Sequence, residues 1–554
     1  MMTQYLKIGV SLVPDPSLGY ERCYNEIEWE KIDVSENYAF ECIERNLEKK
    51  DKTALIWIDE QGYYKRYTFG DLSILSNKLA NVLDSLGIKK GDRVCTLLPK
   101  IPEMYISMLA IWKVGAICVP LFTAFGKKEV MYRIKDSGAK LAITDQINKF
   151  KIDMNELKNF HLIVVNKHEE EYHKDEIDFW KVIESSSPHY DIVETNENDP
   201  ITICYTSGTT GPSKGTVIHR GGVRWLYPWI VYSLLPVNKD SITFNAGDPA
   251  WTFGMFTAGT ANWLMGRTML VYNGKFDVKI WLKIIQDYQV DVLACSPTAL
   301  RMIIAQPNLI EKYNLSNLDR IVVAGEIIAA ESLILAQKLF KCPVLDCYGL
   351  TEAGMIINNY INFPDFKIKF GETVASVGKP LPRFEVKIID EEGKPSNKGE
   401  LAIKLSPWHF ACNYWMNSEE WKKRITEDGY FRTGDLAYCD EEGYFYIIGR
   451  VDDLIKTSAY RIGPAEVESA ILKHPAVQLA AVIGKPDPIR GQIIKAYIVL
   501  KQGYEASQQL ANEIQNFVKN NYSKVAYPRE IEFVDNIPVT ETGKIMRRLL
   551  RTKY

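Results

Sequence analysis

The sequence contains no long hydrophobic run. Its longest apolar stretch covers about residues 108–122, and Lys113 interrupts it. A helix needs about 20 consecutive apolar residues to cross a bilayer, so we expect no membrane-spanning segment. The N-terminal residues also lack a basic segment followed by an apolar core, which is the pattern of a secretory signal peptide. The sequence therefore predicts a soluble protein that is not secreted.

Cysteine pairs and an excess of one charge are also missing. The ten cysteines include no CxxC pair and no cluster with histidine, so neither a zinc site nor a disulfide framework is indicated. This usage is typical of a reducing compartment, and we expect a cytoplasmic protein. The formal net charge is −3, with lysine and arginine spread along the chain. A nucleic-acid partner is therefore not expected.

The chain does have the pattern of an α/β protein. Its 554 residues are too many for one ordinary hydrophobic core, so we expect at least two domains. Apolar strands separated by helical patterns are typical of parallel sheets flanked by helices. The clearest strands are residues 93–98, 141–144, 290–293 and 321–323, and helical spacing marks residues 67–86 and 129–137. The sequence thus predicts a large N-terminal α/β domain, residues 1–450.

The pattern of residues and expected elements changes twice towards the C-terminus. After about Ala375, glycines and prolines separate short strands, which predicts a small antiparallel β-subdomain at about residues 375–450. From Val451 onward, Pro464 stands at the first position of an expected helix, and short strands follow. We therefore expect a small C-terminal α+β domain at residues 451–554.

The segment YTSGTTGPSKG (residues 205–215) lies between two apolar strand candidates. Its glycines allow successive backbone N–H groups to face an anion, and its hydroxyls and Lys214 add further donors. The same residue types also form flexible turns, so composition alone leaves a phosphate cradle and a hairpin tip open. Lys214 precedes Gly215 and a strand, whereas the P-loop of ordinary nucleotidases has Gly-Lys-Ser/Thr leading into a helix.

Five more segments follow this loop in a fixed order. They are Ala324-Gly325-Glu326, DCYGLTE (residues 346–352), YFRTGD (residues 430–435), IGRVDD (residues 448–453) and PVTETGK (residues 538–544). The series resembles the superfamily of adenylate-forming enzymes, which contains acyl-CoA synthetases, peptide-synthetase adenylation domains and luciferases. Within it, the chain is most similar to the acetyl- and medium-chain acyl-CoA synthetases. The resemblance implies an acid–thiol ligase that uses ATP, Mg²⁺ and coenzyme A.

The resemblance assigns most of these residues to the nucleotide. The β- and γ-phosphates would lie in the loop formed by Thr206, Ser207, Gly208, Thr209, Thr210, Gly211 and Lys214. The adenosine would lie against Gly325, Glu326, Asp346, Cys347 and Tyr348, with Tyr348 stacked on adenine. Asp435 would accept both ribose hydroxyls, and Arg450 would add a second ribose contact. Thr351 would contact the α-phosphate, and Glu352 would hold magnesium, a hard cation that requires oxygen ligands.

Each of these residues also has an ordinary structural interpretation. Without the resemblance, Tyr348 would be taken for a core residue, and Asp435 for a turn residue. The pair Thr351-Glu352 would suggest a helix start. Arg450 would pass for a solvated charge. The functional roles therefore depend on the ordered series of segments rather than on any single residue.

Lys544 is expected to carry the chemistry. In the family, the matching lysine reaches from the small domain to the carboxylate substrate and the α-phosphate, where its charge reduces the repulsion between two anions. The two half-reactions of the family use two orientations of that domain, with a hinge at the position of Asp452. After the rotation, Ser458, Ala459 and Arg461 would face the acyl adenylate and the thiol. Many relatives have glycine at the position of Ala459, whose methyl group narrows that path.

The acyl pocket follows from the same resemblance. Its lining would be Trp251, Thr252, Phe253, Ala324 and Gly349. Acetyl-CoA synthetases have tryptophan at the position of Gly349, and medium-chain synthetases have glycine. Replacing an indole by hydrogen frees space for several methylene groups, each worth about 0.8 kcal/mol when buried. We therefore expect a medium-chain, branched or small aromatic acid rather than acetate, although Leu350 stands where medium-chain relatives often have glutamine.

Two other functions stay open. The chain could be a stand-alone adenylation enzyme that loads a carrier protein or an amine. It could also be a nucleotide-binding regulator that has lost its chemistry, but the presence of Lys544, Glu352, Asp435 and Arg461 argues against this. A monomer and a homo-oligomer are both compatible with the sequence.

Overall fold

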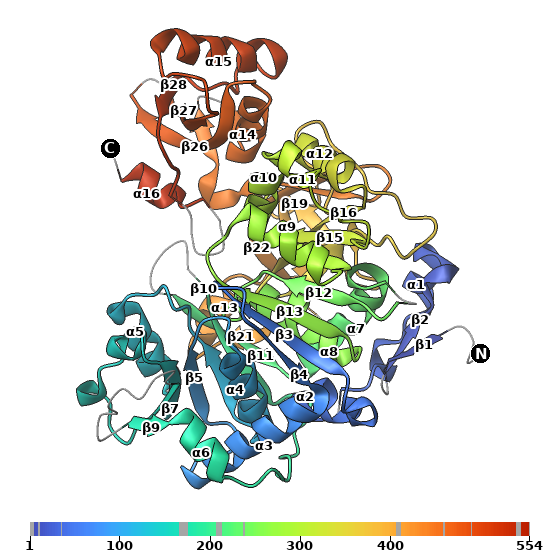
Figure 1. The fold of residues 1–554 in the computed structure, drawn as a ribbon. Coiled ribbons are helices and arrows are strands. Elements are labelled where there is room, and N and C mark those ends of the chain that lie inside the picture. The colour runs from blue at the N-terminus through green and yellow to red at the C-terminus, as the bar shows by residue number, and fades with distance from the viewer. Residues whose placement is uncertain are drawn as a thin grey trace.

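The computed structural model describes residues 5–8, 11–34, 36–165, 176–206, 213–236, 239–405, 411–457, 460–488, 490–538 and 545–552. Two large sheets with their helices form the body of the molecule, and the C-terminal region lies at one end of it (Figure 1). Within the described ranges, no helix is both long and apolar enough to cross a bilayer.

The first large sheet has eight strands. In spatial order these are β21 (Ala411–Tyr414), β11 (Lys214–His219), β10 (Pro200–Thr206), β6 (Ile117–Pro120), β5 (Arg93–Leu97), β7 (Leu141–Asp145), β8 (His161–Val165) and β9 (Glu176–Asp178). The strands from β10 to β9 run parallel, whereas β11 pairs antiparallel with both β10 and β21. Every residue of β6 and β7 is buried, as expected for strands covered on both faces.

Helices on both sides explain this burial. Alternate residues of β5 belong to different hydrophobic clusters: Val94 packs with helices α3 (Phe69–Ser85) and α4 (Pro102–Lys113), and Cys95 packs with α5 (Lys127–Ser137). Helix α3 begins at a capping box in which the side chains of Thr68 and Asp71 bind each other's backbone N–H groups. The helical spacing seen in the sequence therefore predicted α3 and α5 correctly.

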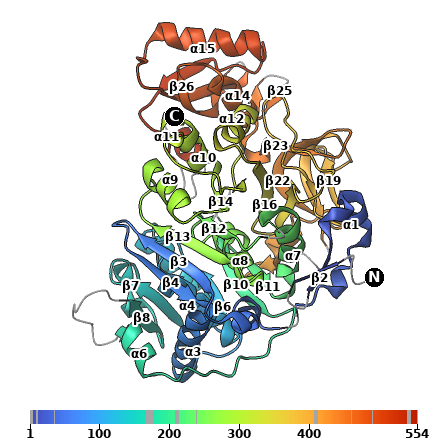
Figure 2. The same ribbon diagram turned by 45° about the vertical axis from the view of Figure 1, so that its right-hand side comes forward.

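The second large sheet has nine strands. They are β18 (Lys379–Pro380), β17 (Gly354–Asn358), β16 (Val344–Leu350), β15 (Arg320–Ala324), β14 (Val292–Cys295), β12 (Ile242–Asn245), β13 (Thr268–Asn273), β3 (Thr53–Asp59) and β4 (Tyr64–Thr68). The strands from β16 to β3 run parallel. Helices α9 (Val278–Asp287), α10 (Pro297–Ile304) and α12 (Ala330–Phe340) cover one face, as Figure 2 shows. Ligands of such sheets bind beyond the carboxyl ends of the strands, which here are the segments that follow Ala324 and Leu350.

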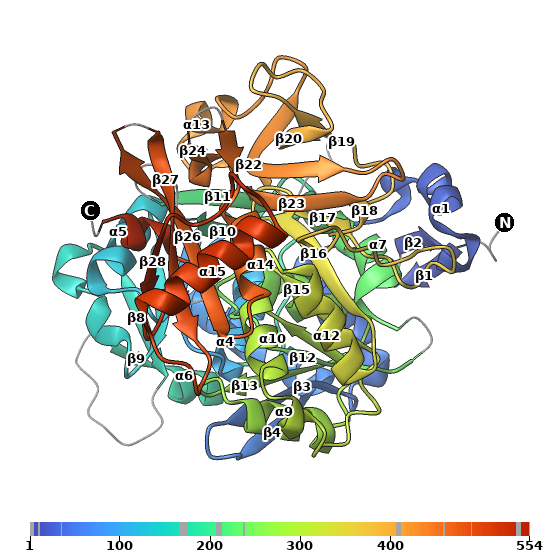
Figure 3. The same cartoon turned by 90° about the horizontal axis from the view of Figure 1, so that it is seen from above.

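A smaller sheet of four antiparallel strands follows. It consists of β19 (Val386–Ile389), β20 (Lys398–Lys404), β22 (Tyr430–Cys439) and β23 (Phe445–Arg450), and it lies along one side of the molecule in Figure 3. Burial alternates along most of β22, as expected when one face of a strand is packed and the other is partly open. The α/β class, the parallel-rich sheets and the small antiparallel sheet were all predicted correctly.

The C-terminal region has its own core. Strands β26 (Val477–Asp487), β27 (Gly491–Leu500) and β28 (Glu530–Phe533) form a sheet, and β24 (Ile455–Thr457) pairs with β25 (Tyr460–Ile462). Helices α14 (Pro464–Leu472), α15 (Gln508–Asn521) and α16 (Arg547–Arg551) accompany them. Val467, Val482, Ile498 and Ile514 belong to a hydrophobic cluster formed by this region alone.

Few polar contacts join the C-terminal region to the rest of the chain. Lys473 Nζ lies 2.7 Å from Glu331 Oε1, and Lys398 Nζ lies 3.2 Å from Glu466 Oε1. At Gly463, an added Cβ would lie 2.8 Å from the carbonyl oxygen of Ile448, so the two backbones approach closely there. Among the described residues, the close backbone approach, these two ion pairs and a hydrogen bond from Lys473 to the carbonyl oxygen of Glu372 thus hold this region against the body.

Candidate active site

The glycine-rich loop joins two antiparallel strands of the first sheet, β10 and β11, which follow the edge strand β21. Strands β10 and β11 pair so that Thr206 and Lys214 are opposite each other. Five expected phosphate ligands, Ser207, Gly208, Thr209, Thr210 and Gly211, lie outside the described residues. The strand–loop–strand arrangement read from the sequence is confirmed, and it differs from a P-loop that opens a helix.

Helix α5 binds both ends of this loop. Tyr205 Oη donates to Asp136 Oδ2 at 2.6 Å, before the loop. After the loop, Tyr132 Oη donates to the carbonyl oxygen of Ser213 at 3.0 Å, and Arg133 Nη2 donates to Ser213 Oγ at 2.7 Å. Sequence reasoning missed this anchor, because nothing near residue 132 indicates a contact 81 positions away.

Lys214 has an acidic partner that the sequence did not suggest. Its Nζ lies 2.9 Å from Glu420 Oε2 and 5.4 Å from the centre of the Tyr414 ring. Hydrogen bonds from Lys423 and then from Lys214 lower the pKa of Glu420 to about 2. The carboxylate of Glu420 is therefore ionised at neutral pH and holds the lysine beside Tyr414.

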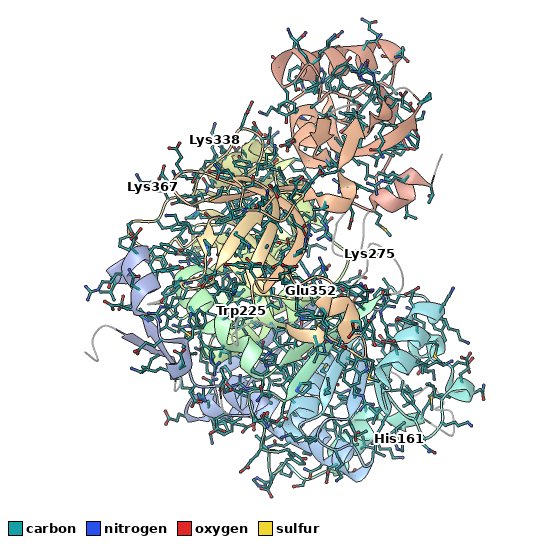
Figure 4. The ribbon with its side chains drawn as sticks, turned by 180° about the vertical axis from the view of Figure 1, so that it is seen from behind. His161, Trp225, Lys275, Lys338, Glu352 and Lys367 are labelled. Carbon is teal, nitrogen blue, oxygen red and sulfur yellow. The ribbon has the colours of Figure 1, made fainter. Side chains whose placement is uncertain are left out.

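Thr351 and Glu352 occupy the tight turn between β16 and β17, so they follow the carboxyl end of a parallel strand. Glu352 is buried and lies in the middle of the molecule in Figure 4. Tyr414 Oη donates to Glu352 Oε1 at 2.9 Å, and Arg424 Nη1 lies 3.9 Å from the same oxygen. Neither Tyr414 nor Arg424 was among the residues expected from the sequence.

The single carboxylate of Glu352 fits a magnesium ion that arrives with a nucleotide. A magnesium ion that is bound together with a nucleotide usually has one or two carboxylate ligands from the protein, keeps several waters and binds the phosphates of the substrate. Glu352 offers one carboxylate, and its Oε2 accepts no hydrogen bond from the described part of the chain. In the same part of the chain, no group of three or more His, Cys, Asp or Glu side chains is arranged to hold a metal ion.

Asp435, Arg450 and Tyr348 come together although the sequence separates them. Arg450 Nη1 lies 2.8 Å from Asp435 Oδ1, because these residues are opposite each other on β22 and β23. Tyr348 Oη donates to Asp435 Oδ2 at 2.7 Å. Burial, and then the charge of Asp435, raise the pKa of Tyr348, so its hydroxyl stays a proton donor. A carboxylate has about four lone-pair sites, so Asp435 can still accept further hydrogen bonds.

The strand ends beyond β15 and β16 bring the remaining nucleotide residues together. Ala324 and Cys347 are opposite each other in the parallel register. Asp346 is buried, and desolvation raises the pKa of its carboxyl group. Glu326 Oε2 accepts hydrogen bonds from Thr298 Oγ1 at 2.7 Å and from Arg301 Nη2 at 2.6 Å.

Trp251 forms one wall of the region assigned to the acyl group. Gly325 has a φ of +97°, and an added Cβ would lie 2.7 Å from the Trp251 ring, so glycine is required there for two reasons. The rings of Trp251 and Phe253 are 5.0 Å apart. Thr252 is half-buried and directly precedes the π-helix Phe253–Thr260. Ala324, at the end of β15, is buried.

The expectation for Gly349 needs a correction. We expected this glycine to open a channel, but an added Cβ would lie 2.4 Å from the carbonyl oxygen of Gly354 and 2.7 Å from Met355 Sδ. The side-chain direction of Gly349 is therefore filled by β17. Because β16 and β17 form a tight antiparallel hairpin, a side chain at position 349 would collide with the returning strand.

The C-terminal residues expected at the site are described only in part. Lys544, Ser458 and Ala459 lie outside the described residues, as does the side chain of Arg461. The backbone of Arg461 belongs to β25, opposite Lys456. Asp452 is exposed and lies in the short 3₁₀ helix Val451–Asp453, which directly follows Arg450.

Known enzymes are similar to this chain over almost its whole length. Residues 43–415 match the family model of the AMP-binding enzymes, and residues 466–544 match the AMP-binding enzyme C-terminal domain. The chain is 36% identical to the acetyl-coenzyme A synthetase of Bacillus subtilis, over 96% of this chain and 94% of the relative. It is 33% identical to the mitochondrial acyl-coenzyme A synthetase ACSM3 of Mus musculus, over 94% and 92%.

A solved structure extends the likeness to the fold. The anthranilate CoA ligase AuaEII, solved in complex with anthranoyl-AMP, superposes with a TM-score of 0.84 at 28% identity. The match covers 95% of this chain and 99% of that one. The whole architecture, including the C-terminal region, is thus similar to that of a protein solved with an acyl adenylate.

Proposed function

The chain belongs to the AMP-binding enzyme family and is an AMP-forming acid–CoA ligase, and we propose that its acid is a medium-chain, branched or small aromatic carboxylate. The reaction has two steps. The carboxylate oxygen first attacks the α-phosphorus of ATP, which forms the acyl adenylate and releases pyrophosphate. The thiol of coenzyme A then attacks the acyl carbon, which forms the thioester and releases AMP.

The arrangement of Asp435 supports this function most directly. Its two carboxylate oxygens are held by Arg450 and Tyr348, at 2.8 and 2.7 Å. The carboxylate is thereby oriented, and its remaining lone pairs suit the two hydroxyls of a ribose. We propose that Asp435 and Arg450 bind the ribose and that the ring of Tyr348 lies along the adenine.

Other residues of the chain would neutralise the negative charge of the phosphates. We propose that Glu352 holds magnesium, which neutralises phosphate charge when bound. Thr351 lies in the same turn and would contact the α-phosphate. Lys214 would contact the departing pyrophosphate, for which it must exchange its ion pair with Glu420 for a phosphate oxygen. Lys544 would supply the positive charge between the carboxylate and the α-phosphate.

The choice of acid rests on the relatives of the chain and not on position 349, whose side-chain direction is filled by β17. The matched proteins include an anthranilate CoA ligase and the mitochondrial acyl-coenzyme A synthetase ACSM3, as well as the acetyl-coenzyme A synthetase of Bacillus subtilis. The anthranilate ligase, whose acid is aromatic, supports an acid larger than acetate for this chain.

We also propose a division into an N-terminal domain, residues 1–450, and a mobile C-terminal domain, residues 451–554, with the hinge at Asp452. The separate hydrophobic cluster of the C-terminal region supports this boundary. A cytoplasmic location is supported by the cysteines whose side chains the structure describes: nine are free and eight of these are buried, and unpaired thiols are typical of a reducing compartment.

A panel of carboxylic acids tests both the function and the choice of acid. AMP release would be measured with acetate, butyrate, hexanoate, octanoate, isobutyrate and benzoate, each with and without coenzyme A. We expect the highest kcat/KM for one of the acids larger than acetate, and AMP release that depends on coenzyme A. Acetate as the best substrate would disprove the proposal for the acid. AMP release that requires a carrier protein or an amine in place of coenzyme A would indicate the alternative acceptor.

A further inference from the structure

A chain of hydrogen bonds links Glu352 to the bulge of strand β22 that carries Asp435. Tyr414 Oη donates to Glu352 Oε1 at 2.9 Å, and Arg424 Nη1 donates to Tyr414 Oη at 3.2 Å. Arg424 Nη2 also donates to the carbonyl oxygen of Thr433 at 2.8 Å. One guanidinium group therefore contacts the partner of Glu352 and the backbone two residues before Asp435.

Packing holds both members of this link in place. Tyr414 is 2% exposed, and its ring meets the ring of Trp421 edge to face at 5.2 Å. The guanidinium of Arg424 lies 4.8 Å from the centre of the Phe431 ring, which suits a cation–π contact. Arg424 Nε adds a hydrogen bond of 3.1 Å to the carbonyl oxygen of Arg432. Neither side chain can change its position without breaking several contacts.

The direction of each hydrogen bond follows from the groups involved. A carboxylate only accepts, so the phenol O–H of Tyr414 donates the hydrogen bond to Glu352. Arginine has only donors, so Arg424 must donate to the phenol oxygen. This arrangement leaves Glu352 Oε2 as the carboxylate oxygen with no donor from the described residues.

The bulge of β22 at residues 433–435, at the other end of the hydrogen-bond chain, is also held by several contacts. Gly434 has a φ of +75°, which favours glycine, and its N–H donates to Glu400 Oε1 at 2.9 Å. The N–H of Asp435 donates to Thr433 Oγ1 at 3.0 Å. Arg450, which pairs with Asp435, also reaches the carbonyl oxygen of Thr433 at 3.4 Å. Arg424 and Arg450 thus both donate to the carbonyl oxygen of Thr433, and Arg424 also donates to Tyr414, the partner of Glu352.

We propose that Tyr414 and Arg424 are positioning residues that hold Glu352 and Asp435 at a fixed separation, so that one MgATP molecule meets both. Tyr414 orients the carboxylate for the metal, and Arg424 couples that carboxylate to the bulge of β22 proposed to bind the ribose. This inference rests on the function proposed above for Glu352 and Asp435. It adds two residues that neither bind the nucleotide themselves nor follow from any local pattern in the sequence.

The variant Tyr414→Phe tests the first part, because it removes only the hydroxyl. Residues that hold a metal ligand typically contribute about 10- to 100-fold to metal affinity or activity. We therefore expect the Mg²⁺ concentration that gives half-maximal ATP binding in calorimetry to rise by about 10- to 100-fold. Binding of adenosine, which has no phosphate, should stay within about twofold of the unmodified protein, because Asp435 keeps its contacts with Arg450 and Tyr348 when the hydroxyl of Tyr414 is removed.

Tyr446→Phe is the matched control. Tyr446 is 4% exposed, lies on β23 of the four-stranded sheet, and its hydroxyl donates to Asp440 Oδ2 at 3.1 Å. Each variant thus loses one hydrogen bond from a phenol to a carboxylate, and the midpoints of thermal unfolding show any general damage. An equal Mg²⁺ dependence in Tyr414→Phe and Tyr446→Phe would overturn the proposed role of Tyr414.

Arg424→Gln tests the coupling. It should weaken MgATP binding as Tyr414→Phe does, and it should also weaken adenosine binding by about 3- to 10-fold, because the hydrogen bond to the carbonyl oxygen of Thr433, two residues before Asp435, is lost. An effect confined to MgATP would disprove the coupling while leaving the role of Tyr414 intact. The unmodified protein gives the separate test of the proposed function: without acid-dependent ATP–pyrophosphate exchange in that protein, the function itself fails, whatever the variants bind.

Discussion

At the scale of single residues, Gly349 is defined by the strand that returns beside it. An alanine there would place its Cβ 2.4 Å from the carbonyl oxygen of Gly354, which is too close for any real contact. Overpacking of this kind costs about 1–3 kcal/mol of stability. We expect Gly349→Ala to lower the free energy of unfolding by that amount in urea denaturation. Gly126→Ala is the control, since no atom lies within 4 Å of its added Cβ. Equal effects of the two substitutions would contradict the packing argument.

Asp346 gives a pH dependence with a defined sign. Desolvation raises its pKa well above the usual value of 3.8. Between the two pKa values the folded protein holds a proton that the unfolded chain has released, so stability falls as pH rises through this window. We expect Asp346→Asn to remove that part of the pH dependence and to be relatively more stable at about pH 8 than at about pH 4. Midpoints of thermal unfolding across this range would measure it, with the exposed Glu392→Gln as the control. A parallel pH profile for Asp346→Asn and the unmodified protein would disprove the prediction.

Lys544 is the residue whose substitution should separate chemistry from binding. A lysine that stabilises the transition state contributes mainly to the rate of attack on phosphorus. We expect Lys544→Ala to reduce acid-dependent ATP–pyrophosphate exchange by about 100-fold or more, by analogy with the loss of one preorganised charge or donor. The dissociation constant of MgATP should change by less than about threefold, since Lys544 acts on the developing charge. Equal losses in exchange and in binding would refute this role.

At the scale of elements, helix α5 acts as the support of the glycine-rich loop. It binds Tyr205 before the loop and Ser213 after it. Removing the hydroxyl of Tyr132 deletes one of these bonds, and a typical hydrogen bond contributes about 0.5–1.5 kcal/mol. We therefore expect Tyr132→Phe to weaken MgATP binding by about 2- to 10-fold in calorimetry. The exposed Tyr63→Phe serves as the control, and equal affinities of the two variants would show that α5 does not support the loop.

At the scale of the whole molecule, ion pairs between described residues join the C-terminal region to the body. Lys473 and Glu331 form one of them, with exposed side-chain fractions of 37% and 50%. Exposed pairs contribute little and are screened by salt, so reversing one charge should change an equilibrium about two- to fivefold. We expect Lys473→Glu to change the ratio of adenylate formation to thioester formation by that factor at low salt. The double variant Lys473→Glu/Glu331→Lys should restore the ratio. If the double variant does not restore the ratio, the ion pair of Lys473 and Glu331 does not determine the orientation of the C-terminal region.

The sequence by itself determined the elements and their order. Apolar runs and helical spacing depend on neighbouring residues, so β5, β7, α3, α5 and the strands on both sides of the glycine-rich loop could be predicted from them. The local surroundings of Glu352 and Asp435 could not be predicted in this way. The pair Thr351-Glu352 by itself suggested a helix start but lies in the turn between β16 and β17, and Asp435 by itself suggested a turn but lies in strand β22.

Only the tertiary structure decided which side chains form hydrogen bonds with Glu352 and with the ends of the glycine-rich loop. Tyr414 is 62 residues from Glu352, and Tyr132 is 81 residues from Ser213. Hydrogen-bond partners that come from different strands and helices leave no periodic or compositional pattern in the chain. The same holds for the space beside Gly349, which is filled because β17 turns back against β16. Local sequence fixes the backbone path of the site, and the packing of distant elements fixes its charges, its hydrogen bonds and its free volume.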